Sequence, residues 1–275
     1  MRAWMNGQLL ADPTAPAVPV TDHGFTVGDG VFESIKVVDG QPFAFARHLE
    51  RLARSAAGLS LPEVDEAAVR AGVVAVLEGQ DLPLGRVRIT YTGGHAPLGS
   101  GRGDDSTTLV VVADAMAPWP ETTSVASVPW PRNERGALSG LKTTSYAENV
   151  VALARAHECG ATEAMFANLA GHLCEGTGCN VFYVVGGELR TPSLASGCLA
   201  GVTRALVLEW YGGVEVDEPI EVAAAADEVF LVSTTRDVQA VARWDDRELA
   251  APGPVTAAVA ARWREREPEL LGLDR

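Results

Sequence analysis

The first part of the chain carries two hydrophobic periodicities, one typical of helices and one typical of strands. Apolar residues recur at helical spacing over residues 45–57, and a second, alanine-rich helix is predicted over residues 65–77. The strands predicted from alternating or continuous apolar runs between turn residues are 4–10, 31–38, 86–91 and 108–113. A glycine-rich loop, residues 93–105, is expected between the last two strands.

A tryptophan flanked by two prolines marks the boundary of the second part. We therefore expect a domain of residues 1–115, a linker of residues 116–123 and a second domain of residues 124–275. Beyond the linker, the predicted strands are 124–128, 163–168, 180–185, 188–191 and 228–233, and the predicted helices are 146–158, 203–210 and 255–266. Val150 and Val151, on the first of these helices, are expected to face a core. The mixture predicts an α/β protein of two lobes.

The composition is that of a globular protein with an acidic surface. Apolar residues make up 47% of the 275 residues, which excludes low-complexity disorder. With 22 Lys and Arg against 36 Asp and Glu, the formal net charge is −14. This charge offers a phosphate backbone no sequence-independent attraction, so we expect no nucleic-acid partner. No apolar run approaches the ~20 residues that cross a membrane, and the start lacks the pattern of a secretory signal, so we expect a cytoplasmic protein.

Several common sites are missing from the sequence. The four cysteines are 15, 5 and 19 residues apart and include no C-x-x-C pair, which predicts reduced thiols and no metal site. No P-loop, dinucleotide-binding glycine pattern, zinc-protease motif or hydrolase nucleophile motif occurs. What remains is a set of scattered polar residues at the ends of predicted elements.

The first candidates are a lysine and a glutamate. Lysine occurs only at Lys36 and Lys142, whereas arginine fills the general role of surface cation. In a pocket that disfavours its ammonium form, Lys142 would be a nucleophile for a carbonyl carbon, although a surface lysine explains the residue better when it is taken alone. Glu175, before a glycine turn, would be either a solvated carboxylate or a buried acid that matches a cation or a protonated ring nitrogen.

Two further segments could form a phosphate site. Val202 and Thr203 stand at the start of a predicted helix, where N–H groups and a hydroxyl attract anions, although Thr203 would equally cap the helix. Thr234 and Thr235 follow a strand and would either complete the site or form an ordinary turn. Arg51 would supply the positive charge or belong to a solvated arginine stripe on helix 45–57.

Taken together, these features resemble the class-IV, fold-type IV aminotransferase family. Its members are branched-chain aminotransferases, D-amino-acid transaminases and 4-amino-4-deoxychorismate lyases. A Schiff-base lysine, an acid for a ring nitrogen and a phosphate cup are what their cofactor, pyridoxal 5′-phosphate, requires. The motifs follow the family's order from about residue 4 to about residue 241. They read DHGFTVGDGVFESIKVVDG, FARHLERLARSA, LKTTSYAENVVALARAHECGATEAMF, CEGTGCNVF, LRTPSLASGCLAGVTR and ADEVFLVSTTRDV.

The resemblance implies a small N-terminal α/β domain and a larger C-terminal domain with a pseudo-barrel sheet. It also implies a homodimeric enzyme in which Lys142 is catalytic and forms the Schiff base with the cofactor, while Glu175 pairs with the ring nitrogen. The other cofactor-binding residues would be Arg51, Tyr146, Val202, Thr203, Thr234 and Thr235. The substrate side would be lined by Val27, Gly28, Phe32, Tyr91, His95 and Arg102.

Departures from each member's pattern favour the lyase slightly. D-amino-acid transaminases have an Arg-Gly pair after the strand that leads into the substrate loop, and here Tyr91 stands in place of that arginine. Branched-chain enzymes are usually longer, but lyases commonly have an asparagine three residues after the lysine, where this chain has Ser145. We expect a 4-amino-4-deoxychorismate lyase, which releases pyruvate and 4-aminobenzoate for folate biosynthesis. A transaminase for branched-chain or other small amino acids is the alternative. A binding protein without catalysis is a third, against which the intact Lys142 and Glu175 argue.

Overall fold

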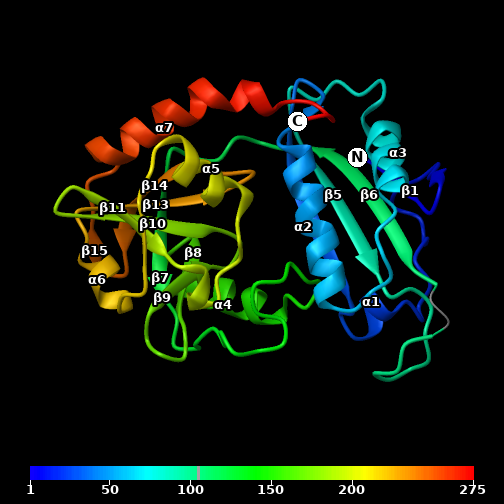
Figure 1. The fold of residues 1–275 in the computed structure, drawn as a ribbon, viewed down its shortest axis with the longest axis horizontal. Coiled ribbons are helices and arrows are strands. Elements are labelled where there is room, and N and C mark those ends of the chain that lie inside the picture. Colours follow the sequence, from blue (N-terminus) through cyan, green and yellow to red (C-terminus); the bar gives the residue numbers. More distant parts are fainter. Residues whose placement is uncertain (104–105) are drawn as a thin grey trace. The chain divides into compact units, whose positions relative to one another are not determined.

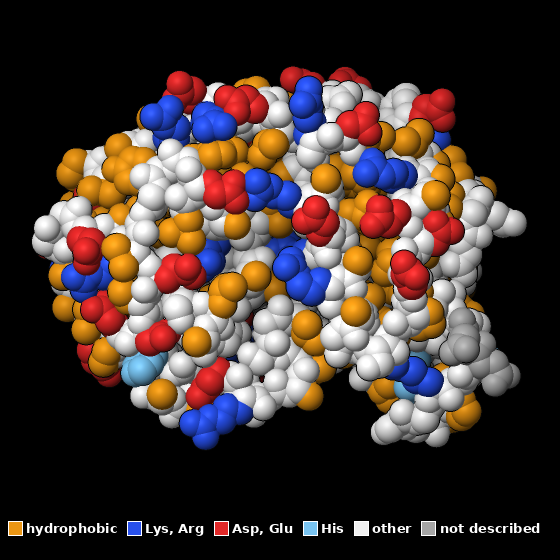
Figure 2. Space-filling view, viewed as in Figure 1, with side chains coloured by type: hydrophobic (Ala, Val, Ile, Leu, Met, Phe, Trp, Pro, Cys, Tyr) orange, Lys and Arg blue, Asp and Glu red, His pale blue; other side chains and the backbone are white. Residues whose placement is uncertain are grey.

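The structure is a computed structural model that describes residues 1–103 and 106–275. Asp104 and Asp105, at the end of the predicted loop 93–105, lie outside the described residues. Within the described ranges, no helix is both long and apolar enough to cross a membrane. On the face drawn in Figure 2, acidic and basic side chains are interspersed over the surface, with apolar atoms between them.

The described residues form two compact units. The first consists of Met1–Pro118, Leu141–Ser145 and Glu269–Arg275, and the second of Trp119–Gly140 and Tyr146–Pro268. The first boundary falls inside the expected linker. Two later stretches, Leu141–Ser145 and Glu269–Arg275, nevertheless belong to the first unit. The predicted domains, each a continuous stretch of chain, did not include this.

The first unit is built on an antiparallel sheet of order β2-β1-β6-β5-β3-β4. Its strands are β1 (Arg2–Met5), β2 (Gln8–Leu9), β3 (Gly30–Val38), β4 (Gln41–Pro42), β5 (Leu84–Thr92) and β6 (Thr108–Ala115). In the register of β3 and β5, Phe32 is opposite Thr90 and Ser34 is opposite Arg88. Directly opposed residues share a face of the sheet, so these four lie together on one side.

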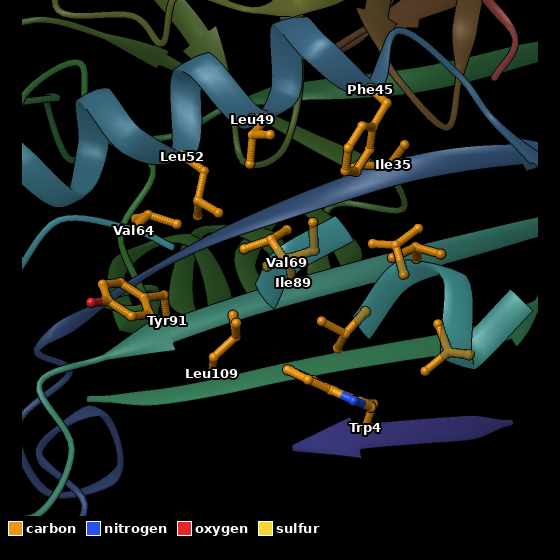
Figure 3. Packing of buried hydrophobic residues seen from close by; sticks show 14 of the residues in the cluster. Trp4, Ile35, Phe45, Leu49, Leu52, Val64, Val69, Ile89, Tyr91 and Leu109 are labelled. Carbon is orange, nitrogen blue, oxygen red and sulfur yellow. The ribbon is translucent and has the colours of Figure 1, made fainter. Parts of the chain in front are cut away.

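Two helices cover the other face of this sheet, α2 (Phe45–Gly58) and α3 (Glu66–Leu77) (Figure 1). The apolar stripes of both helices interdigitate with strand residues (Figure 3), and full burial of each large apolar side chain contributes about 1.5–3 kcal/mol. The cluster includes Trp4, Ile35, Phe45, Leu49, Leu52, Val69, Ile89 and Leu109. A short helix, α1 (His23–Thr26), precedes β3.

The stretch Leu141–Ser145 lies along the first half of β3. The N–H of Phe32 donates to the carbonyl oxygen of Lys142 at 3.0 Å, and the N–H of Thr144 donates to that of Gly30 at 2.8 Å. Backbone pairing, rather than any local preference of this irregular stretch, therefore sets the position of Lys142 beside the sheet.

The second unit contains a mixed sheet of order β12-β11-β10-β13-β14-β7-β8-β9, with β15 paired to β14. Its strands are β7 (Thr122–Ser127), β8 (Glu163–Ala167), β9 (Leu173–Gly176), β10 (Asn180–Val185), β11 (Glu188–Pro192), β12 (Val214–Val216), β13 (Glu228–Ser233), β14 (Asp237–Trp244) and β15 (Arg247–Glu248). β9 ends one edge of the sheet, yet a tight turn joins it to β10 near the other edge. The sheet must therefore curl.

The helices of this unit are α4 (Ala147–Glu158), α5 (Val202–Trp210), α6 (Ile220–Ala224) and α7 (Pro254–Arg266). The expected inward position of Val150 and Val151 on α4 is wrong, because these side chains are 65% and 53% exposed. The buried side of α4 instead carries Asn149, Ala152 and Ala156. Small side chains on that side let the helix approach β8 closely.

Candidate active site

Lys142 stands where β3 and α2 meet in the first unit. Its Nζ lies 4.4 Å from the centroid of the Phe32 ring. Its backbone N–H donates to Oγ of Ser55 on α2 at 3.2 Å. The charge of Lys142 also acts on His48, a buried residue of α2. The half-buried lysine is thus held close to the residues that surround Arg51.

Arg51, Glu33 and His48 form a buried polar cluster between α2 and β3. Nε and Nη2 of Arg51 donate to Oε1 and Oε2 of Glu33 at 2.8 and 2.7 Å, and Nδ1 of His48 lies 2.7 Å from Oε2. Burial opposes ionisation of Glu33, but the charge of Arg51 and the hydrogen bonds from Arg51 and His48 lower its pKa to about 2. Burial also lowers the pKa of His48, so its neutral ring donates from Nδ1 to the carboxylate. The bidentate pair fixes the guanidinium that the sequence assigns to a phosphate.

The Phe32 ring is flanked by a second cation, Arg88 of β5. The guanidinium carbon of Arg88 lies 3.8 Å from the ring centroid, and its Nε donates to Oγ1 of Thr90 at 3.3 Å. A cation over an aromatic face is attracted by the ring's quadrupole. Phe32, which the sequence assigns to the substrate side, therefore links Arg88 to Lys142.

In the second unit, Glu175 lies on β9 with its carboxylate held from two sides. Oε2 accepts the N–H of Leu199 at 2.9 Å, and Oε1 lies 3.4 Å from Nε of Arg132. The side chain is 14% exposed. A carboxylate so far removed from water needs charged or hydrogen-bonding partners, and this one has both. Its surroundings fit an acid that faces a protonated ring nitrogen.

The N-terminus of α5 fits the phosphate group that the sequence predicts. Val202 and Thr203 are its first residues, and Gly201 is the N-cap. Within the described part of the chain, the buried Oγ1 of Thr203 has no hydrogen-bond partner. A buried hydroxyl without a partner is costly, and the free N–H groups of a helix start attract anions. A phosphate placed here would satisfy both.

Asn180 organises the segment before α5, although the sequence assigned it no role. Its Nδ2 donates to the carbonyl oxygen of Leu199 at 2.9 Å, while Glu175 accepts the N–H of the same residue. A Cβ built on Gly201 would lie 2.0 Å from Oδ1 of Asn180. Position 201 therefore admits only glycine while Asn180 keeps this place.

Replacing Gly201 by alanine is expected to weaken binding of pyridoxal 5′-phosphate by about tenfold or more and to lower the free energy of unfolding by about 1–3 kcal/mol. The backbone of Gly201, at φ −67° and ψ 135°, suits alanine, so the cost comes from the contact with Asn180. Fluorescence titration and urea unfolding measure both quantities. Gly178→Ala is the matched control, because a Cβ there meets nothing within 4 Å. Equal effects of the two variants would contradict the steric argument.

Thr234 and Thr235 form the turn between β13 and β14. Arg236 ends this turn, and its Nη2 donates to Oε2 of the buried Glu163 at 2.8 Å. The other oxygen of Glu163 accepts the N–H of Thr177 at 3.0 Å. The two-threonine turn is thereby tied to the glycine turn that follows Glu175.

Of three residues assigned to the substrate side, Tyr91 takes another position, while the roles of Val27 and His95 stay predictions. Tyr91 lies in the core of the first unit, 4% exposed, and its hydroxyl donates to the carbonyl oxygen of Pro62 at 3.2 Å. This corrects the expectation, since side chains alternate along β5 and Tyr91 faces away from Phe32. Val27, at the end of α1, is 47% exposed, and His95 is exposed as well.

Arg102 attaches the glycine-rich loop to the rest of the first unit. Its Nε and Nη2 donate to the two carboxylate oxygens of Asp29 at 2.7 and 2.6 Å, and its guanidinium also donates to two carbonyl oxygens just after α2. His23 lies 2.9 Å from the same carboxylate and 2.8 Å from the carbonyl oxygen of Gly99. The hydrogen bond with Asp29 raises the pKa of His23. The substrate role of Arg102 stays a prediction beside this anchoring role.

Sequence reasoning missed several partners of the assigned residues. Arg88 had a partial signal, because it alternates with core residues along β5 and so lies on the face away from the core, although only the strand register places it beside Phe32. Arg132 had none. Glu33 and Asn180 stand within two of the family-like motifs, but those motifs do not say which residues they contact. Tyr146 directly precedes α4 and is half-buried, and its expected hydrogen bond to the cofactor stays a prediction.

Comparisons with known proteins find relatives over most of the chain. A family model described as amino-transferase class IV matches residues 30–244. A putative branched-chain-amino-acid aminotransferase of Methanocaldococcus jannaschii is 31% identical over 258 residues, which are 90% of this chain and 89% of that protein. An aminodeoxychorismate lyase of Bacillus subtilis is 27% identical over 248 residues, 86% of this chain and 84% of that protein. The crystal structure of a branched-chain aminotransferase from Thermoproteus uzoniensis with norvaline superposes with a TM-score of 0.90 at 27% identity, covering 98% of both chains.

Proposed function

Because this chain belongs to the amino-transferase class IV family, whose enzymes depend on pyridoxal 5′-phosphate, we propose that it is an aminotransferase for a small amino acid. The family, the fold-type IV fold, the enzymatic nature and the cofactor expected from the sequence are confirmed. The observation that carries the proposal is the grouping of the Lys142 amine and the Arg88 guanidinium around the Phe32 ring. For an amino-acid substrate, the site needs a lysine amine whose place on the cofactor the substrate amine can take, and a cation that binds the substrate carboxylate.

The bound cofactor supplies an electron sink for the carbanion formed at the α-carbon of the substrate. In this proposal, Lys142 would hold the cofactor through its amine, and its Nζ would be the base that takes the proton from the α-carbon of the substrate. Backbone pairing with β3 anchors the lysine while its long side chain moves. Glu175 holds a proton on the ring nitrogen, which its bond to Leu199 and its ion pair with Arg132 support.

Three groups of residues are proposed to bind the phosphate of the cofactor. The orphaned hydroxyl of Thr203 and the N–H groups at the start of α5 support one of them. The turn of Thr234 and Thr235, braced through Arg236, supplies further donors. Arg51 adds a cation that it shares with Glu33, and this pair holds the orientation of the guanidinium.

Arg88 is assigned to the substrate carboxylate, and Arg88→Met is expected to raise KM for the amino acid by about tenfold or more. The reason is the loss of a charged donor beside Phe32, while kcat falls less. Steady-state kinetics measure the split. Arg86→Met is the matched control, because Arg86 is also exposed, lies two residues earlier on β5 and should leave KM unchanged. An unchanged KM in Arg88→Met would remove this residue from the substrate side.

Aminodeoxychorismate lyase is the second candidate. The missing Arg-Gly pair argues against a D-amino-acid transaminase, and one relative named aminodeoxychorismate lyase is 27% identical. The aminotransferase is preferred because the relative at 31% identity and the structure with a TM-score of 0.90 both carry that name. Handedness of the amino acid, assembly as a homodimer, a cytoplasmic location and a part in folate biosynthesis stay predictions.

Two assays on the purified protein with pyridoxal 5′-phosphate separate the candidates. An amino acid and 2-oxoglutarate should yield a new keto acid and glutamate. Aminodeoxychorismate should yield little pyruvate or 4-aminobenzoate. Release of those two products without any amino transfer would overturn the aminotransferase and support the lyase. A loaded protein inactive in both assays would contradict both candidates.

A further inference from the structure

Arg132 is held between the candidate acid and a carboxylate at the surface. Its Nε lies 3.4 Å from Oε1 of Glu175, and its Nη1 donates to Oε2 of Glu148 at 2.5 Å. Its Nη2 donates to Oδ1 of Asn149 at 2.5 Å, and the guanidinium stacks 4.0 Å from the centroid of the Phe166 ring. Three polar contacts and a ring therefore fix one orientation of this planar cation, which the point charge of a lysine would not match.

The two carboxylates differ in their access to water. The side chains of Glu175 and Arg132 are 14% and 15% exposed, whereas that of Glu148 is 52% exposed. Glu148 lies in the first turn of α4, where a negative charge is favoured by the helix dipole. Arg132 therefore pairs with two carboxylates, the half-buried one of Glu175 and that of Glu148, which solvent already stabilises.

Three thiols are near enough for the charge of Glu175 to act on them, those of Cys174, Cys179 and Cys198. Burial raises the pKa of all three thiols above its usual value, that of Cys198 to about 11. All three are therefore neutral at physiological pH. They do not offset the charge that Arg132 presents to Glu175.

We propose that Arg132 is a positioning residue that keeps Glu175 ionised and directed at the ring nitrogen of the cofactor, and that Glu148 on the surface sets the strength of this effect. The inference rests on the proposed role of Glu175. It makes Glu148, Arg132 and Glu175 one electrostatic chain from solvent to the candidate site.

The direction of the effect follows from the basicity of Glu175. A proton between a ring nitrogen and a carboxylate stays on the nitrogen when the carboxylate is the weaker base. The positive charge of Arg132 makes Glu175 the weaker base. Removing Arg132 moves the proton toward the glutamate. Removing Glu148 takes away the carboxylate that shares the guanidinium with Glu175, which holds the proton more firmly on the nitrogen.

The test is the pH titration of the visible band of the bound cofactor, at about 410–430 nm. A protonated ring nitrogen withdraws electrons and makes the link between lysine and cofactor easier to deprotonate, which lowers the titration midpoint. Arg132→Met is expected to raise the midpoint by about one pH unit, and Arg132→Lys should recover part of that shift. Glu148→Gln is expected to lower it by about 0.3 pH unit. Glu158→Gln, which removes a 67% exposed carboxylate from the same helix, should leave it unchanged.

A double variant distinguishes this chain of contacts from a general effect of charge. With Arg132→Met in place, Glu148→Gln should cause no further shift. A shift that persists in that background, or an equal shift in Glu158→Gln, would overturn the inference. If Arg132→Met does not fold, the comparison of Glu148→Gln with Glu158→Gln still decides. A wild-type protein without a visible band would instead overturn the proposed function, so the two failures remain distinct.

Discussion

Alanine in place of Lys142 is expected to abolish the visible band of the bound cofactor and to lower kcat by at least about a thousandfold. The loss has two causes, because the same amine both bonds to the cofactor and moves the proton of the substrate in the proposed reaction. Absorbance of the reconstituted variant and single-turnover kinetics measure the two losses separately.

The scarcity of lysine makes this prediction easy to control. Lys36 is the other lysine of the chain, and it is buried on β3 with its Nζ 5.9 Å from the Phe43 ring. Lys36→Met should keep the visible band. After borohydride reduction of the wild type, mass spectrometry should find the cofactor on the peptide of Lys142. Label on Lys36, or an intact band in Lys142→Ala, would show that the wrong lysine has been assigned.

Arg51→Met is expected to lower the free energy of unfolding by about 3–5 kcal/mol. The substitution leaves the carboxylate of Glu33, which is fully buried, without the bidentate cation that offsets its desolvation. Urea unfolding at neutral pH measures the change. Binding of pyridoxal 5′-phosphate should weaken in the same variant, because the proposed phosphate site loses its positive charge.

Arg54 offers the matched control on the same helix. It is exposed, so Arg54→Met should change the free energy of unfolding by no more than about 0.5 kcal/mol. Adding Glu33→Gln to Arg51→Met should recover part of the loss, since the buried charge is then removed. Equal stabilities of Arg51→Met and Arg54→Met would mean that the buried pair contributes nothing.

The same cluster predicts an acid-sensitive fold. The pKa of Glu33 falls from 4.5 to about 2 in the folded state, so its contribution to stability is complete above pH 4.5 and is lost as the pH falls toward 2. His48 has a pKa below its usual 6.5, so it adds to the loss from about that pH downward. Unfolding free energies of wild type and Glu33→Gln measured across this range should converge at the acid end.

Local patterns predicted most elements, and the exceptions have a physical reason. The stripe of Phe45, Leu49 and Leu52 predicts α2 because a helix repeats every 3.6 residues. β14 was missed because its buried positions do not alternate. It lies inside the sheet, where it pairs with β13, β7 and β15, and α7 packs against it. On α4 the valines suggested the wrong face, because small side chains rather than large ones mark a closely packed helix.

The candidate site divides in the same way. The motifs led to Lys142, Glu175 and Thr203 because each stands at a characteristic place in its own segment. The partners of these residues could not be predicted, since Arg132 and Asn180 meet Glu175 and Leu199 only after β9, β10 and the turn before α5 have come together. Tyr91 was assigned wrongly for the same reason. Its position in the chain suggested the substrate side, but side chains alternate along β5 and that of Tyr91 points into the core.

The sequence alone determined the family and the cofactor and proposed residues for the chemistry, because motifs and periodicity are properties of short stretches of chain. Only the tertiary structure decided which charges are neighbours. The pairs Glu33–Arg51 and Arg132–Glu175, and the contact of Arg88 with Phe32, join segments from different elements. Coulomb and cation–π energies depend on distance in space, and the pairing of strands and the packing of helices set that distance, so no local pattern in the chain encodes it.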